Sequence, residues 1–295
     1  MLSEKPWKAE AIARLLLSVL VCLAAASLVV SGFHYAAGGK ARLAFFALAA
    51  VALGFLIAAV LLMQKLWTLE NFVSRAVGLM VCIFAGLSAG AWAEKIAGPT
   101  PANNSGQQML LTEAVVIILL ARFVREHGVS WAEAFGLRNR WGYAALAGVT
   151  GACVFMPVGE GLQWASVEAM TRLHWKPHEQ QAVQVLRETA GGTARLSLAL
   201  LAIFLAPMVE EILFRGILYP AIKKAGFPRL ALCGTAFLFA IMHSSAAIFA
   251  PLVVLAIMFT LLYEKTNNLL APIAAHAVFN GLNFAKLYLF EKQMN

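Results

Sequence analysis

Apolar residues in this chain are gathered into runs long enough to cross a lipid bilayer. Ala11–Phe33, Leu43–Met63 and Phe72–Trp92 each reach the roughly 20 residues that a membrane-spanning helix needs. Six further apolar runs follow: Met109–Val124, Tyr143–Val158, Leu196–Tyr219, Leu230–Phe249, Pro251–Tyr263 and Leu269–Phe290. None of them shows the in-out alternation of strands in a membrane barrel. The sequence therefore predicts an all-α, polytopic membrane bundle of about eight or nine transmembrane helices.

Some of these runs are short for a full membrane crossing. Met109–Val124 and Pro251–Tyr263 do not reach the roughly 17 residues at the lower end of the range for spanning helices. We expect such segments to be tilted, half-buried or interfacial, because a short apolar stretch cannot cover the whole hydrocarbon thickness.

Composition agrees with a membrane protein. Of the 295 residues, 61% are hydrophobic and 13% are charged, whereas a soluble domain carries about 25% charged residues. The net charge of +8 would suggest nucleic acid in a soluble protein. Here the basic residues lie mainly between the apolar runs, where they suit anionic lipid headgroups. We therefore expect the lipid bilayer as a partner, no nucleic acid and no obligate protein partner.

The chain divides into two regions in this interpretation. Residues 1–140 hold the first transmembrane helices and an interfacial segment, and residues 141–295 hold a second transmembrane core. Arg125–Arg140 mixes Trp, Phe, Leu and basic residues, which is typical of a helix at the headgroup level. The largest predicted extramembrane segment is Gly159–Arg195, and Pro177–Glu188 within it reads as a short helix that opens at a proline.

Three charged residues interrupt the otherwise apolar stretch Leu196–Pro220. They are Glu210, Glu211 and Arg215, and an ionised side chain at bilayer depth costs from about 3 to more than 10 kcal/mol. Glu211 and Arg215 are four residues apart in the order that favours a same-face ion pair. Glu210 is turned by about 100° and needs another partner. Upstream, Pro207 lacks a backbone N–H and is predicted to bend the helix.

Candidate partners of Glu210 lie on two later apolar runs. His243 is in one, while His276 and Asn280 are four residues apart on one face of the other. A carboxylate and an imidazole that touch the same water can activate it as a nucleophile. A second imidazole and an amide N–H can donate hydrogen bonds to an oxyanion. These groups together are sufficient for hydrolysis of a peptide bond.

The three motifs resemble those of the CPBP family (CAAX protease and bacteriocin-processing, or Abi) of intramembrane proteases. That family, whose members include the Ras-converting CAAX endopeptidase, carries Glu-Glu-x-x-x-Arg, Phe-x-x-x-His and His-x-x-x-Asn/Asp on three spans. In this chain they read as residues 210–215, 239–243 and 276–280, within a motif-bearing segment at 196–290. The residues around Glu210 resemble the bacterial branch, which implies the inner membrane of a bacterial cell.

The resemblance implies an intramembrane endopeptidase acting on a prenylated or membrane-associated protein or peptide. Glu210 and His243 would position and activate the water, while His276 and Asn280 would stabilise the oxyanion. Three further residues would support the site, by holding its architecture or the substrate backbone: Glu211, Arg215 and Phe239.

A metal is the alternative to a metal-free water. One carboxylate and two imidazoles, here Glu210, His243 and His276, could hold Zn²⁺ or Fe²⁺. The sequence has no HExxH motif, and the resemblance implies a metal-free site, so we expect no cofactor and keep zinc as the alternative.

Two other functions remain open from the sequence. A non-catalytic immunity or scaffold protein of the same fold could retain the motifs, and an ion or proton transporter could use the same carboxylates and histidines. The transporter is weakened because no pair of Gly/Pro-broken helices recurs in two halves of the sequence.

Overall fold

The structure is a computed structural model that describes residues 5–37, 102–177, 180–189 and 192–294. Every regular element in these ranges is a helix, so the predicted all-α class is confirmed. Two predicted spans, Leu43–Met63 and Phe72–Trp92, lie outside the described residues.

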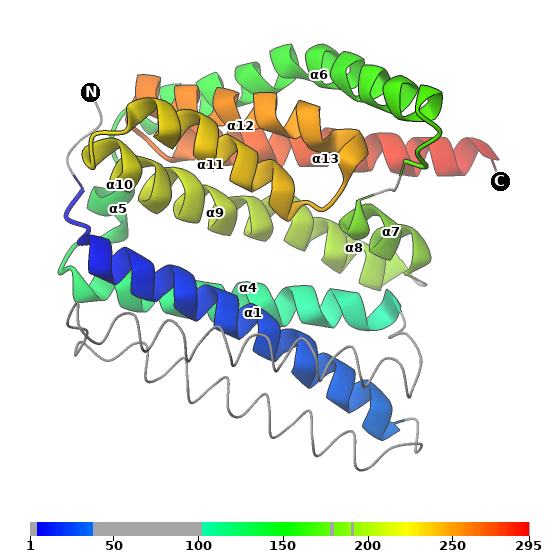
Figure 1. Ribbon diagram of the computed structural model, residues 1–295, viewed down its shortest axis with the longest axis horizontal. Helices are drawn as coiled ribbons and strands as arrows, with labels where there is room; N and C mark the ends of the chain where they lie inside the picture. Colours follow the sequence, from blue (N-terminus) through cyan, green and yellow to red (C-terminus); the bar gives the residue numbers. More distant parts are fainter. Residues whose placement is uncertain (1–4, 38–101, 178–179, 190–191, 295) are drawn as a thin grey trace. The chain divides into compact units, whose positions relative to one another are not determined.

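The chain forms two compact units (Figure 1). Lys8–Glu126 forms the N-terminal unit, in which α1 (Ala9–Ala37) packs against α4 (Ala102–Glu126). The other, motif-bearing unit comprises His127–Asn295 and the start of the chain up to Trp7. The predicted spans Ala11–Phe33 and Met109–Val124 fall inside α1 and α4 respectively.

The motif-bearing unit contains all three sequence motifs. Its helical segments in chain order are α5 (Trp131–Phe135), α6 (Trp141–Arg172), α7 (Gln181–Glu188), α8 (Gly192–Leu200), the π-helical η1 (Leu201–Leu205), α9 (Ala206–Glu211), the π-helical η2 (Ile212–Leu218), α10 (Tyr219–Lys224), α11 (Pro228–Met242), α12 (Ala246–Thr266) and α13 (Leu270–Met294). Helix α6 packs along both α12 and α13, and α11 packs between α10 and α12.

Three helices in the described ranges are long and apolar enough to cross a membrane. They are α6, the continuous helical run Gly192–Lys224 and α12. Helix α11 is equally apolar in character but shorter. Their length and composition are those of the spans of an integral membrane protein.

Two predicted boundaries differ from the structure around α11 and α12. The sequence placed a break between Phe249 and Pro251, whereas α11 ends at Met242 and α12 begins at Ala246. The break occurs at Ser244, whose φ of 52° is in the left-handed region and ends the helix. Pro251 lies inside α12, because a long buried helix tolerates one missing N–H. Pro251–Tyr263 is therefore part of a 21-residue helix that is long enough to span.

Helix α6 also extends further than predicted. The sequence placed the largest extramembrane segment at Gly159–Arg195, but the helix continues without interruption to Arg172 and includes Pro157. The short helix predicted at Pro177–Glu188 is present as α7, which begins at Gln181.

The segment predicted to be interfacial is tied to the turn between α12 and α13. Ser130 caps α5 and forms a reciprocal capping box with Glu133. The hydrogen bond from Ser130 is the largest cause that lowers the pKa of Glu133 below its ordinary value. The fully buried Asn268 donates to the carbonyl of Asn139 at 2.7 Å, and Leu269 N donates to Phe135 O at 3.0 Å.

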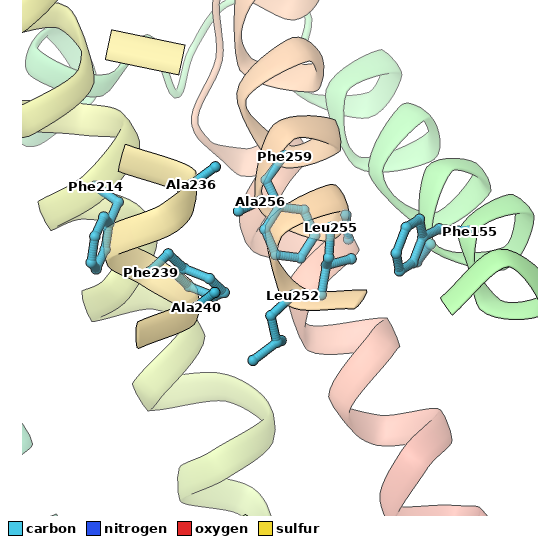
Figure 2. Close-up of a cluster of buried hydrophobic side chains, with 11 residues drawn as sticks. Phe155, Phe214, Ala236, Phe239, Ala240, Leu252, Leu255, Ala256 and Phe259 are labelled. Atoms are coloured by element: carbon cyan, nitrogen blue, oxygen red, sulfur yellow. The ribbon is translucent and has the colours of Figure 1, made fainter. Parts of the chain in front are cut away.

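A buried apolar cluster joins the helices that carry the motifs. Figure 2 shows Phe239 of α11 between Phe214 of η2 and Phe259 of α12 within this cluster. On the other side of α12, α6 and α13 approach closely. A Cβ on Gly148 of α6 would lie 2.3 Å from the carbonyl oxygen of Ala271, so only glycine fits there. This packing fixes α13, and with it the third motif, inside the unit.

Candidate active site

The two glutamates lie at the end of a short α-helical stretch between two π-helical ones. Helix α9 ends at Glu211, with η1 before it and η2 after it. Pro207, predicted to disturb this helix, sits at the start of α9 directly after η1. Inserted π-helical turns are frequent at functional sites because they shift side chains out of the regular helical register.

Glu211 and Arg215 form the predicted ion pair. Arg215 Nη1 donates to Glu211 Oε1 at 2.7 Å, and the two side chains are 1% and 0% exposed. Arg215 Nη2 also donates to the backbone carbonyl of Ala256 in α12 at 3.0 Å. A buried ion pair is retained only when such additional hydrogen bonds compensate for the loss of water. The pair therefore links η2 to α12.

Aromatic rings surround the guanidinium of Arg215. Its central carbon lies 4.7 Å from the ring centroid of Phe239, 5.2 Å from that of Phe259 and 5.8 Å from that of Phe214. Cations are attracted to the faces of aromatic rings, most strongly when water is excluded. These ring contacts replace part of the lost solvation of the guanidinium and limit the directions in which it can point.

His276 is held from two sides. Its Nδ1 lies 3.0 Å from Glu211 Oε1, so an Nδ1–H donates to the same carboxylate oxygen that pairs with Arg215. Its ring stacks on Phe259, with centroids 4.9 Å apart and planes at 28°. These contacts fix the ring, and they direct the opposite nitrogen, Nε2, toward Glu210.

His243 is oriented in a similar way by the backbone. Its Nδ1 lies 2.8 Å from the carbonyl oxygen of Phe239, which can only accept, so Nδ1 carries the hydrogen. The Nε2 atom then faces Glu210. His243 follows the last residue of α11, and its ring lies against that of Phe239 at 4.6 Å between centroids.

Three of the four predicted catalytic residues meet at one point, where His243 and His276 both approach the same carboxylate oxygen of Glu210. Glu210 Oε2 lies 4.0 Å from His243 Nε2 and 3.9 Å from His276 Nε2. This oxygen is buried and has no hydrogen-bond partner among the described residues, although 30% of the Glu210 side chain is exposed. Two groups that bond to one shared water, each at about 2.8 Å, lie roughly 4 to 5 Å apart. The spacing therefore suits an acid and two imidazoles that share a water.

The same distances can be compared with those around a metal. Two ligands of a tetrahedral Zn²⁺, each about 2.1 Å from the metal, lie about 3.4 Å from one another, which is shorter than the 3.9 and 4.0 Å around Glu210. In the described ranges, no group of three or more His, Cys, Asp or Glu side chains is spaced to hold a metal ion.

Asn280, the fourth predicted catalytic residue, has a different contact. Its Nδ2 donates to the backbone carbonyl of Ala202 in η1 at 2.8 Å. A carboxamide nitrogen carries two hydrogens, so one N–H is used in this bond and the second remains for another acceptor.

Phe259 could not be recognised as a site residue from the sequence. Helix α12 carries no polar motif, and Phe259 is one of many apolar residues in it, so spacing alone could not show that its ring stacks on His276. The backbone carbonyls of Ala202 and Ala256, which receive Asn280 and Arg215, were equally invisible because every residue has one.

Comparison with known proteins places these motifs in a family. Residues 192–282 match the model of the type II CAAX prenyl endopeptidase Rce1-like family, and the matched range contains all three motifs. No curated protein and no solved structure matched the chain. The resemblance stated from the motifs is thereby confirmed. The match covers about a third of the chain, from α8 to the middle of α13, and its model is that of the Rce1-like type II CAAX prenyl endopeptidases.

Proposed function

We propose that this protein is a multi-pass intramembrane endopeptidase, resident in a bacterial inner membrane, that hydrolyses a peptide bond in a prenylated or membrane-associated protein or peptide. The observation that supports this most directly is the convergence of His243 Nε2 and His276 Nε2, at 4.0 and 3.9 Å, on Glu210 Oε2. The endopeptidase family match over residues 192–282 gives independent support.

In the proposed reaction Glu210 is the general base. A water bonded to Glu210 Oε2 and to His243 Nε2 gives a proton to the carboxylate as its oxygen attacks the scissile carbonyl. The new C–O bond converts the carbonyl to a tetrahedral oxyanion. The C–N bond then breaks, and the proton held by Glu210 passes to the departing amine. The net change is addition of one water across the peptide bond.

The oxyanion requires hydrogen-bond donors that are already in place. His276 is held by Glu211 at Nδ1 and by Phe259 at its face, so a proton on Nε2 would be directed into the same space as Glu210. The second N–H of Asn280 is the other proposed donor. Removal of one such donor typically costs about 3 kcal/mol of barrier, because a preorganised donor needs no rearrangement during the reaction.

The test is a single conservative substitution, Glu210→Gln, in protein reconstituted into lipid vesicles. The probe is an internally quenched peptide ending in a farnesylated cysteine followed by three residues, the sequence form that directs prenylation. We expect cleavage to fall by about 10²- to 10⁴-fold, because Gln cannot accept the proton. Glu168→Gln, on an exposed carboxylate of α6, is the matched control and should cleave normally.

Two further arms separate the alternatives. The same peptide without the farnesyl group shows whether prenylation is needed, and a metal chelator followed by zinc addition tests a site held by Glu210, His243 and His276. Full cleavage by the Glu210→Gln variant would refute the mechanism. Failure of the wild-type protein to cleave either peptide would favour the non-catalytic scaffold of the same fold.

A further inference from the structure

One carbonyl in η1 lacks the usual donor from its own helix. In this π-helical turn Ala206 N–H donates to Leu201 O, five residues back. The next bond in the same pattern would run from residue 207 to Ala202 O, but residue 207 is Pro207, which has no N–H. The α-helical donor for Ala202 O would be Ala206 N–H, which donates to Leu201 instead. Neither helical pattern therefore satisfies the carbonyl of Ala202.

Asn280 provides the missing donor from another helix. Its Nδ2 lies 2.8 Å from Ala202 O, and Ala202 is 8% exposed. A buried carbonyl at membrane depth has no water to bond with, so losing the donor that Asn280 provides is costly. The hydrogen bond from Asn280 thus ties η1 to α13 at the point where Pro207 interrupts the backbone ladder.

This tie lies within reach of both sides of the catalytic convergence. Ala202 is eight residues before Glu210 on one helical run, which corresponds to about 12 Å along the axis. Asn280 is one turn after His276 on α13. The hydrogen bond between Ala202 and Asn280 therefore controls the distance between Glu210 and His276.

From these contacts we infer that Asn280 is a positioning residue: it replaces the donor that Pro207 lacks, and so holds the Glu210 helix against α13. The consequence for catalysis rests on the proposed function, whereas the coupling between Asn280 and Pro207 does not. The role differs from donation to the oxyanion, because it depends on whether residue 207 has an N–H.

A double-mutant cycle separates the two roles. The variants are Asn280→Leu, Pro207→Ala and the double variant, with Pro207→Leu as a second way to restore an N–H if Pro207→Ala is poorly produced. Asn283→Leu is the matched control, because Asn283 donates to a carbonyl of its own helix, Phe279 O, and is exposed. Thermal unfolding in detergent is the first measurement, and kcat and KM on the farnesylated peptide are the second.

We expect Asn280→Leu to lower the Tm by about 3 °C or more in the wild-type background, because a buried carbonyl is left unpaired. In the Pro207→Ala background the loss should fall below half, since residue 207 then supplies the donor. The kcat of Asn280→Leu should drop with little change in KM, and it should recover at least tenfold when Pro207→Ala is added. Asn283→Leu should change none of these quantities.

Equal losses of Tm in the two backgrounds would overturn the coupling between Asn280 and Pro207. A coupled Tm without recovery of kcat would overturn the positioning role and leave Asn280 as an oxyanion donor alone. If the wild-type protein cleaves no peptide, the proposed function fails, but the Tm cycle still supports or overturns the coupling.

Discussion

Glu210 and Glu211 are adjacent in the chain but lie in opposite surroundings. Glu211 is 0% exposed, and its Oε1 accepts from Arg215 at 2.7 Å and from His276 at 3.0 Å. Glu210 is 30% exposed, and its Oε2 faces the Nε2 atoms of His243 and His276 across 3.9 to 4.0 Å. A rotation of about 100° around the helix axis, one residue along the chain, therefore separates a dry ion pair from a side chain that water can reach.

The difference shows how one short motif can serve two purposes. The dry half, formed by Glu211, Arg215 and the rings of Phe239 and Phe259, has close contacts and little exposure, which suit rigidity. The open half around Glu210 has longer spacings that suit a small reactant. His276 belongs to both, because its Nδ1 contacts the dry half and its Nε2 faces the open one. Rigidity on one side is what keeps the other side in position.

The largest effect on stability is expected from Arg215→Met. This change leaves Glu211 buried beside His276 without the guanidinium, and breaking a buried ion pair in this way costs about 3 to 5 kcal/mol. The matched control is Arg172→Met in α6, which removes a pair with the same four-residue spacing, Glu168 and Arg172, at 42% and 78% exposure. That control should lose at most about 1 kcal/mol. Denaturant unfolding in detergent measures both, and similar losses in the two variants would contradict the comparison.

A double substitution sharpens the same comparison. Replacing both partners, with Glu211→Leu and Arg215→Met, removes the unpaired charge and should recover roughly 2 kcal/mol of the loss seen in Arg215→Met alone. Cleavage should stay at least about tenfold below wild type, because His276 has lost the acceptor at Nδ1 that fixes its orientation. Recovery of both stability and cleavage would show that the pair only fills space.

A smaller effect is expected from Phe259→Leu. The substitution keeps an apolar side chain but removes the ring that stacks on His276 at 4.9 Å. We expect kcat to fall about tenfold with little change in KM, because a misplaced donor or base loses rate more than binding. Phe249→Leu is the control on the same helix, since Phe249 packs on Phe237. Equal kcat values for the two variants would remove Phe259 from the site.

Local spacing predicted part of this site. The four-residue interval between Glu211 and Arg215 predicted their pairing, and the 2.7 Å contact confirms it. The fold class followed from the length of the apolar runs. The catalytic roles of Glu210, His243, His276 and Asn280 stay predictions, because no contact in the structure tests what they do.

Other features could not be predicted from local patterns. The meeting of three helices at Glu210 Oε2 was inferred from polar residues within apolar runs and from the family motifs, because spacing within one helix says nothing of packing between helices. The stacking of Phe259 and the bond from Asn280 to Ala202 depend on such packing. The break after α11, at Ser244, was not predicted because the sequence of an apolar run does not show that a serine will adopt a φ of 52°. The break was instead predicted at Pro251, which lies inside α12.

A third buried charge, outside the membrane-spanning helices, extends the comparison. Lys5 is 6% exposed, and its Nζ donates to the carbonyl of Ala134 at 2.7 Å and lies 5.7 Å from the ring centroid of Tyr263. Burial lowers the pKa of Lys5 from 10.5 to about 8. Between these values the unfolded chain binds more protons than the folded protein, so stability should rise with pH.

The expected gain is about 1 kcal/mol between pH 7 and pH 9, measured by denaturant unfolding in detergent. Lys5→Met keeps the length of the side chain but cannot titrate, so the difference between wild type and this variant isolates the contribution of Lys5 from that of other groups. If the difference in unfolding free energy between wild type and Lys5→Met stays constant over this range, Lys5 titrates alike in the folded and unfolded states. The contrast with Arg215 would then be lost, because that contrast depends on a lysine releasing the proton that a buried arginine retains.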